Sequence, residues 1–285
     1  ERGVDWKVQY DRFRPKVTPK TSEAELAQIM REMLSTLDDG HVTLTVPQSP
    51  LFNANKIFRE RLEDDLFSLN VVKDYLQSNA VTGEDDAYLY GKTKTENLGY
   101  IHFAHVGENF NVLPTFLAEE AKGYIVDLRH NEGGDFTYSF KVLGRFTDQR
   151  RFVFKSKTLN GIGKYTPWKE WYLEPSKDPL LKPIVVLVDR YTISAAERTV
   201  MALKTLPQVT ILGDTTSGAH GTMIGRELSN GWFYSLVPQK VLMPDGLSYE
   251  GKGIAPHRVV KNTKEGMKEG RDVVLEQAIV HLSKL

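Results

Sequence analysis

Between residues 98 and 285, apolar strand-like runs alternate with helix-like segments, and this alternation constrains the fold more than any other feature of the sequence. The runs KGYIVDLR at 122–129 and PIVVLVD at 183–189 are nearly continuous in apolar residues, which is typical of strands buried on both faces. A short loop and then a helix-like segment follow each run, at 137–146 and 194–206. Strands that alternate with helices in this way predict an α/β core.

The first 97 residues follow a different pattern. Apolar residues recur at helical spacing over 21–37, and HVTLTV at 41–46 alternates like a strand. These patterns predict an N-terminal helical segment over 1–46 that ends in a strand. Residues 47–97 predict a small β-containing insert, in which LFSLNVV and AYLYGK are strand-like. The core is expected at 98–285, with a loop over 150–180.

The overall charge and the lack of cysteine narrow the classes of function, although a local charged patch is compatible with zero net charge. The 285 residues hold 37 basic and 37 acidic side chains, so the net charge of zero favours neither a nucleic acid nor an anionic membrane as partner. The absence of cysteine excludes disulfides, a cysteine nucleophile and thiolate metal sites. No apolar run approaches the roughly 20 residues of a membrane span. The seven histidines show no ligand spacing of the HExxH kind, so no metal site is expected. An organic cofactor is likewise not expected.

Ser194 lies where the strand-like run at 183–189 gives way to a helix. The first amides of a helix are free and favour negative charge, which suits the oxyanion formed when a serine attacks a carbonyl. Serine is also a preferred helix N-cap, so the local pattern allows both a cap and a nucleophile. The adjacent glycines Gly133 and Gly134 follow the other buried run and could bring a free amide to the same place, or could form a plain turn.

Two further residues could complete a serine-based site. A serine hydroxyl needs a base, and His41 stands between a helix and a strand, where it is either that base or a surface histidine. Glu250 could orient the imidazolium and raise its pKa, or could be a solvated loop acid.

Four motifs occur together in a particular order: IVDLR with the paired glycines, VLVD with TISAAE, ILGDTTSG, and YEGKGIAP. In this order they resemble the catalytic core of the tail-specific (C-terminal-processing) serine protease family, peptidase family S41. The resemblance implies a Clp protease/crotonase-like spiral β-β-α core. It also implies a serine endopeptidase that acts on peptides or proteins through an acyl-enzyme on Ser194.

One departure places the chain on a particular branch of that family. Members with a Ser/Lys dyad carry the lysine 25 residues after the serine, where this chain has Ala219 followed by His220. The sequence therefore looks like the tricorn-core and interphotoreceptor-retinoid-binding-protein-like branch, which uses Ser, His and Glu. Carried over position by position, the resemblance implies Ser194 as nucleophile, His41 as base and Glu250 as supporting acid, with His220 as a rival base. The amides of Gly134 and Ala195 would form the oxyanion hole, and the choice between Gly133 and Gly134 stays open.

The resemblance also bears on domains and location. Many relatives insert a PDZ domain after the N-terminal helices, but 47–97 is too short for one, so none is expected. Bacterial relatives are mostly exported, so a periplasmic or cell-surface location is expected, with the signal outside this chain. The oligomeric state stays open, and the alternative function is a catalytically silent ligand- or peptide-binding protein on the same scaffold.

Overall fold

The computed structural model describes residues 2–118 and 120–285, and its largest element is a seven-stranded sheet of order β14-β10-β9-β6-β5-β4-β3. Five neighbouring strands are parallel and two antiparallel strands complete one edge. The parallel strands are β5 (Gly99–Phe103), β6 (Tyr124–Asp127), β9 (Ile184–Val188), β10 (Val209–Gly213) and β14 (Arg258–Val259), and the antiparallel strands are β3 (Val81–Thr82) and β4 (Tyr88–Lys92).

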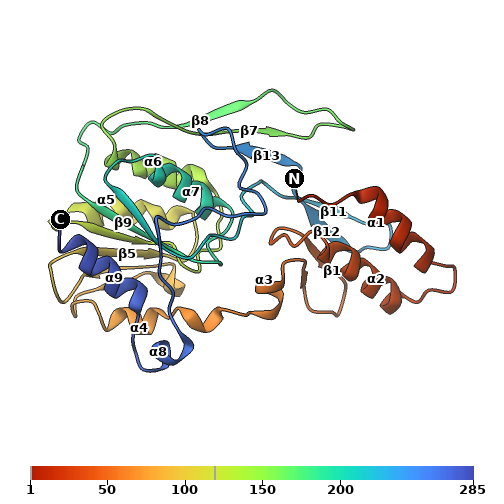
Figure 1. Ribbon diagram of the computed structural model, residues 1–285, viewed down its shortest axis with the longest axis horizontal. Coiled ribbons are helices and arrows are strands. Elements are labelled where there is room, and N and C mark those ends of the chain that lie inside the picture. The colour runs from red at the N-terminus through yellow and green to blue at the C-terminus, as the bar shows by residue number, and fades with distance from the viewer. Residues whose placement is uncertain (1, 119) are drawn as a thin grey trace.

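Helices cover both faces of this sheet (Figure 1). One face carries α5 (Leu113–Ala118), α6 (Phe136–Leu143) and α7 (Ala195–Lys204), and the other carries α4 (Leu69–Lys73) and α9 (Val273–Leu282). In β9, Ile184, Val186 and Val188 point to the first face, while Val185 and Leu187 point to the second. Because side chains alternate along a strand, a strand covered on both sides must be apolar throughout. Each such side chain stabilises the fold by roughly 1.5–3 kcal/mol relative to exposure.

A four-stranded antiparallel sheet of order β11-β12-β1-β2 joins the N-terminal region to the core. Its strands are β1 (Thr43–Thr45), β2 (Phe52–Asn53), β11 (Ile224–Glu227) and β12 (Phe233–Leu236). Helices α1 (Trp6–Phe13) and α2 (Glu23–Ser35) belong to the same region, where Leu44 packs with Leu34 and Trp232 in a separate apolar cluster. The pairing of β1 with β12 fixes the segment that contains His41 against residues about 190 positions later.

A third sheet of order β13-β7-β8 extends along the molecule above α6 and α7 (Figure 1). Its strands are β7 (Arg151–Thr158), β8 (Lys169–Leu173) and β13 (Gln239–Leu242). The remaining helices are α3 (Lys56–Glu60) and α8 (Lys264–Lys268), with short 3₁₀ turns η1 (Arg14–Lys16), η2 (Asp64–Leu66), η3 (Glu84–Asp86), η4 (Glu108–Val112) and η5 (Gly144–Phe146). None of the helices in the described part of the chain is long and apolar enough to cross a bilayer.

The predicted α/β class is confirmed, and two local predictions are wrong. LFSLNVV at 66–72 contains the end of η2 and most of α4 rather than a strand, because Val72 of this short helix packs into the apolar cluster on one face of the sheet. The segment 150–180 is not a loop but contains the β7–β8 hairpin. Of the predicted insert 47–97, β2 pairs in the four-stranded sheet and β3 and β4 pair in the core sheet. The three-part division of the chain stays a prediction.

Candidate active site

Ser194 occupies a sharp turn between β9 and α7. Its φ of 63° and ψ of −123° lie in a region that a residue with a side chain rarely adopts, at a cost on the order of 1–3 kcal/mol. Its side chain makes no capping hydrogen bond, so the helix-cap interpretation has no support in the geometry. The conformation is held by the backbone, since the Ser194 N–H donates to the carbonyl of Ala219 at 3.0 Å. A strained serine between a strand and a helix is the arrangement of a nucleophile elbow.

Ser194 opens onto a cavity of about 480 Å³ that lies between the core and the four-stranded sheet. Several residues proposed from the sequence line it together: Ser194, His41, Gly134 and Ala195. The rest of the wall consists of Glu132, Asp135, Phe136, Arg198, Gly221, Thr222 and Met223. The segments that meet here come from residues 41, 132–136, 194–198 and 221–223, so the cavity exists only in the folded chain.

The two glycines differ in what their amides do. The Gly133 N–H donates to Asn131 Oδ1 at 3.0 Å, whereas the Gly134 N–H has no acceptor within the described part of the chain. Ala195 is the first residue of α7, and its N–H likewise has no acceptor among those residues. Gly134 and Ala195 therefore present two unpaired amides to the Ser194 cavity, while the Gly133 amide is already in use.

Close packing explains why both positions are glycine. Gly133 has a φ of +82°, and a Cβ there would lie 2.5 Å from the Ser194 Cβ. Gly134 has a φ of +136°, and a Cβ there would lie 2.2 Å from the carbonyl oxygen of Val106. The loop can approach the serine and Val106 this closely only without side chains.

Asp189 joins the glycine loop to the serine turn. Its Oδ1 accepts the backbone N–H of His130 in the glycine loop at 3.1 Å, and those of Tyr191 and Thr192 before the serine at 3.0 Å each. The His130 ring nitrogen Nδ1 lies 2.6 Å from the same carboxylate. Since His130 precedes the glycines and Tyr191 precedes the serine, this one side chain links the two loops that carry the unpaired amides.

His41 lies just before β1 and is 7% exposed. Its backbone N–H donates to Asp39 Oδ1 at 2.8 Å and its carbonyl accepts from Ser235 Oγ at 2.6 Å. Burial lowers the pKa of the His41 imidazole, and the opposing charge of Asp39 does not offset that effect. The upward shift expected from the sequence is therefore wrong: desolvation outweighs the nearby carboxylates, and His41 is neutral at neutral pH.

His220, the rival base, lies behind the cavity wall and is fully buried. Its Nδ1 is 3.9 Å from Glu197 Oε1 and its Nε2 is 3.7 Å from Glu250 Oε2, distances that suit ion pairs rather than hydrogen bonds. Burial opposes protonation, but the two carboxylates outweigh it and raise the pKa of His220. A buried histidine held toward its charged form is a poor proton acceptor at neutral pH.

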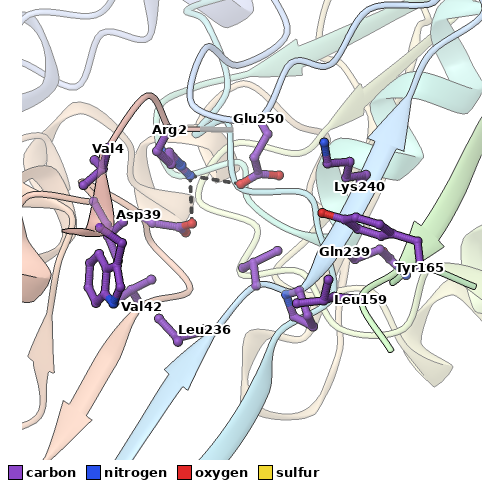
Figure 2. Close-up of a pocket in the computed structure, with 14 residues that line it drawn as sticks. Arg2, Val4, Asp39, Val42, Leu159, Tyr165, Leu236, Gln239, Lys240 and Glu250 are labelled. Atoms are coloured by element: carbon purple, nitrogen blue, oxygen red, sulfur yellow. Dashed lines mark hydrogen bonds and ion pairs between the residues drawn. The ribbon is translucent and has the colours of Figure 1, made fainter. Parts of the chain in front are cut away.

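Glu250 contacts the loop that carries His220, and it contacts Arg2 of the N-terminal region (Figure 2 shows the Arg2 contact). Its Oε2 accepts the backbone N–H groups of His220 and Gly221 at 3.2 and 3.1 Å, and its Oε1 accepts from Arg2 Nη2 at 3.0 Å. Arg2 also lies 3.2 Å from Asp39 Oδ2, so its guanidinium stands between the two carboxylates. These side chains form part of the wall of a second cavity of about 450 Å³. Burial raises the pKa of Glu250, with Arg2 and His220 opposing.

Sequence reasoning missed Glu197 and Arg198, which occupy the first turn of α7. The buried Glu197 carboxylate accepts the Gly218 and Ala219 N–H groups at 2.8 Å each, and so holds the loop that carries His220. Arg198 Nε donates to the His220 carbonyl at 2.8 Å, and burial lowers the Arg198 pKa to about 10. The available signal was two adjacent charges in a helix whose other residues are mostly apolar.

The side chains of the described residues contain no cluster of three His, Asp or Glu that could hold a metal ion.

Comparison with known proteins supports a peptidase relationship. The model of the family described as peptidase family S41 matches residues 97–260. Carboxy-terminal processing protease CtpA of Bacillus subtilis is 30% identical over 173 residues, which cover 59% of this chain and 36% of CtpA. The chain thus spans about a third of the length of this curated relative.

Solved structures agree with the fold. A protein from Parabacteroides merdae, described as a candidate peptidase, superposes with a TM-score of 0.86 and 30% identity, covering 99% of this chain and 90% of that one. The tricorn protease superposes with a TM-score of 0.51 and 16% identity, covering 87% of this chain and 23% of that one, which shows a shared fold. The predicted Clp protease-like α/β fold and the predicted resemblance to tail-specific proteases are both confirmed.

Proposed function

This chain belongs to peptidase family S41, a family of serine peptidases, and from that premise we propose that it is a serine endopeptidase that acts through an acyl-enzyme on Ser194. One observation carries the proposal. A strained serine, a neutral histidine and two unpaired amides line a single cavity, although they come from three distant parts of the chain.

In the proposed mechanism, His41 takes the proton of the Ser194 hydroxyl as its oxygen attacks a peptide carbonyl. The Gly134 and Ala195 amides donate hydrogen bonds to the oxyanion, whose charge they stabilise more strongly than that of the ground-state carbonyl. His41 then gives its proton to the leaving amine, and an acyl-enzyme remains. A water molecule activated by His41 attacks the ester, and the acid product leaves with the serine restored.

We keep Glu250 as the proposed acid, with an indirect role that differs from the direct contact implied by the resemblance. Glu250 holds the amides of His220 and Gly221, and Gly221 forms part of the cavity wall. Asp39 is the carboxylate that most raises the pKa of His41, so it contributes the charge that favours the imidazolium. His41 is preferred to His220 as base because it lines the cavity and is neutral.

The substrate is proposed to be a peptide or protein, because the matched relatives are named processing proteases. We further propose an exported enzyme with no nucleic-acid partner, which rests on the family resemblance and on the balanced charge. Localisation of the tagged full-length protein by cell fractionation tests the first of these points.

Reaction with a fluorophosphonate probe tests the proposed function. We expect the wild-type chain and His220→Gln to be labelled, and Ser194→Ala not to be labelled. His41→Gln should react at least 100-fold more slowly, because loss of a general base costs roughly 10²–10⁴ in rate. A wild-type chain that does not react would support the silent binding protein instead. Rapid labelling of His41→Gln together with loss of labelling in His220→Gln would reverse the assignment of the base.

A further inference from the structure

The balanced charge of the whole chain conceals a strongly basic segment. Residues 150–170 contain six basic side chains and one acidic, a net charge of +5, so the remainder of the chain carries −5. The basic residues are Arg150, Arg151, Lys155, Lys157, Lys164 and Lys169, and the acid is Glu170. This segment is the β7–β8 hairpin, which extends along one side of the molecule and ends in a loop that projects past the core (Figure 1).

The tip of the hairpin is an ordered turn that exposes apolar side chains. Leu159 and Tyr165 form a bridge across it, and the Asn160 N–H donates to the Lys164 carbonyl at 2.7 Å. Ile162 stands at its outermost position and is fully exposed, with Leu159 43% exposed and Tyr165 39% exposed beside it. The flanking Gly161 and Gly163 have open space around them, so the end of the turn is free, while the base of the tip is held by the Leu159 N–H, which donates to the Pro238 carbonyl at 2.9 Å.

Behind the tip, lysines alternate with aromatic rings. Lys157 Nζ lies 4.5 Å from the centroid of Tyr165 and 4.7 Å from that of Trp168, and Lys155 Nζ lies 5.1 Å from Trp168. Lys240 of the adjoining strand β13 pairs with Lys157 and lies 5.5 Å from the same tyrosine ring (Figure 2). Because a strand advances about 3.3 Å per residue, Lys157 lies about 7 Å behind Leu159, and Lys155 about 7 Å further back.

We propose that the β7–β8 hairpin docks this protein onto an anionic membrane surface. The order of side chains along the hairpin follows the order found with depth in a bilayer: the apolar Ile162 lies outermost, lysines and aromatic rings lie behind it, and the body of the protein follows. Lysines attract the negative headgroups, aromatic rings favour the interface, and Ile162 enters the edge of the acyl region. An acidic polypeptide or a nucleic acid would match the lysines but would leave Ile162 in water.

Co-sedimentation of the full chain with vesicles of 30% phosphatidylglycerol in phosphatidylcholine tests the proposal. We expect binding that weakens as salt rises, and little binding to pure phosphatidylcholine. Ile162→Ser should lower the partition coefficient about 10-fold, and the double variant Lys155→Gln with Lys157→Gln about 25-fold, since each lysine near such a surface contributes about fivefold.

Matched controls test whether binding depends on the hairpin itself or on overall charge and any exposed apolar side chain. Leu247→Ser removes another exposed leucine, 56% exposed, and Lys268→Gln with Lys284→Gln removes two exposed lysines near the C-terminal helices. Both controls should bind the vesicles as the wild type does. The proposal is overturned if the chain does not bind anionic vesicles at low salt, or if the controls lose as much binding as the hairpin variants. It is also overturned if Ile162→Ser binds normally while the lysine variant does not, because binding is then electrostatic alone and the tip does not enter the bilayer.

Discussion

The strained backbone of Ser194 predicts that removing its side chain stabilises the protein. The φ of 63° and ψ of −123° are accessible to glycine without steric penalty, but they cost a residue with a Cβ on the order of 1–3 kcal/mol. Ser194→Ala keeps that strain and loses no hydrogen bond, because the serine side chain makes no capping contact. We therefore expect Ser194→Ala to be about as stable as the wild type, although a helix-cap serine replaced by alanine would lose about 1 kcal/mol.

Ser194→Gly should exceed both in stability. Glycine relieves the strain of about 2 kcal/mol at mid-range but adds roughly 0.5–1 kcal/mol of conformational freedom to the unfolded chain, so the expected net gain is about 1 kcal/mol. For a chain of this length about 1 kcal/mol corresponds to about 2 °C, so the melting temperature should rise by about 2 °C over that of Ser194→Ala. Both variants should lose hydrolysis by a factor on the order of 10⁶ if Ser194 is the nucleophile.

The assay is a paired measurement of thermal unfolding and equilibrium urea denaturation for the wild type and both variants at the same pH. Agreement between the two methods guards against an irreversible thermal transition. If Ser194→Gly is no more stable than Ser194→Ala, the backbone at this turn is not strained and the nucleophile-elbow argument loses its main support. If Ser194→Ala alone is strongly destabilised, the side chain acts as a cap after all.

Three further predictions concern the histidines and Asp189. Because burial lowers the pKa of His41, kcat/KM should rise with pH through a step below 6.5 and be level above it; a step above pH 7 would contradict the assignment of this base. Burial lowers the pKa of the fully buried His102 to about 4. Its neutral form therefore contributes up to about 3 kcal/mol of stability, which is present above pH 6.5 and is lost as pH falls toward 4. In urea titrations, His102→Gln should lose correspondingly less unfolding free energy than the wild type between pH 7 and pH 4. Asp189→Asn should lower kcat about 10²-fold with little change in KM or in the pH step, because it loosens both proposed oxyanion donors. The control variant Asp214→Asn, at the end of the neighbouring strand, should keep a near-normal kcat. Equal losses of kcat in the two variants would indicate a purely structural role for Asp189.

The core of the fold was predictable because its signals are local. A strand buried on both faces has to be apolar at every position, and β6 and β9 display that requirement in their own residues. The hairpin at 150–170 was not predictable in the same way. Its two strands alternate lysines with aromatic residues and face solvent on one side, so the segment resembles a polar loop until its pairing partner is known.

The sequence by itself determined the residue types of the site and the order in which they occur: paired glycines after one buried strand, a serine after the next, a histidine before β1 and a glutamate near the end. The tertiary structure alone decided the surroundings of each of them. Whether a histidine is neutral and faces the cavity, as His41 is, or is buried between two carboxylates, as His220 is, depends on solvent exclusion and on charges from other segments. Glu250 is paired with Arg2, 248 positions away, and only the closed fold brings those charges together. Local sequence propensities act over only a few residues and cannot bring such distant groups together. The pKa values and partners of these groups are therefore properties of the packed molecule.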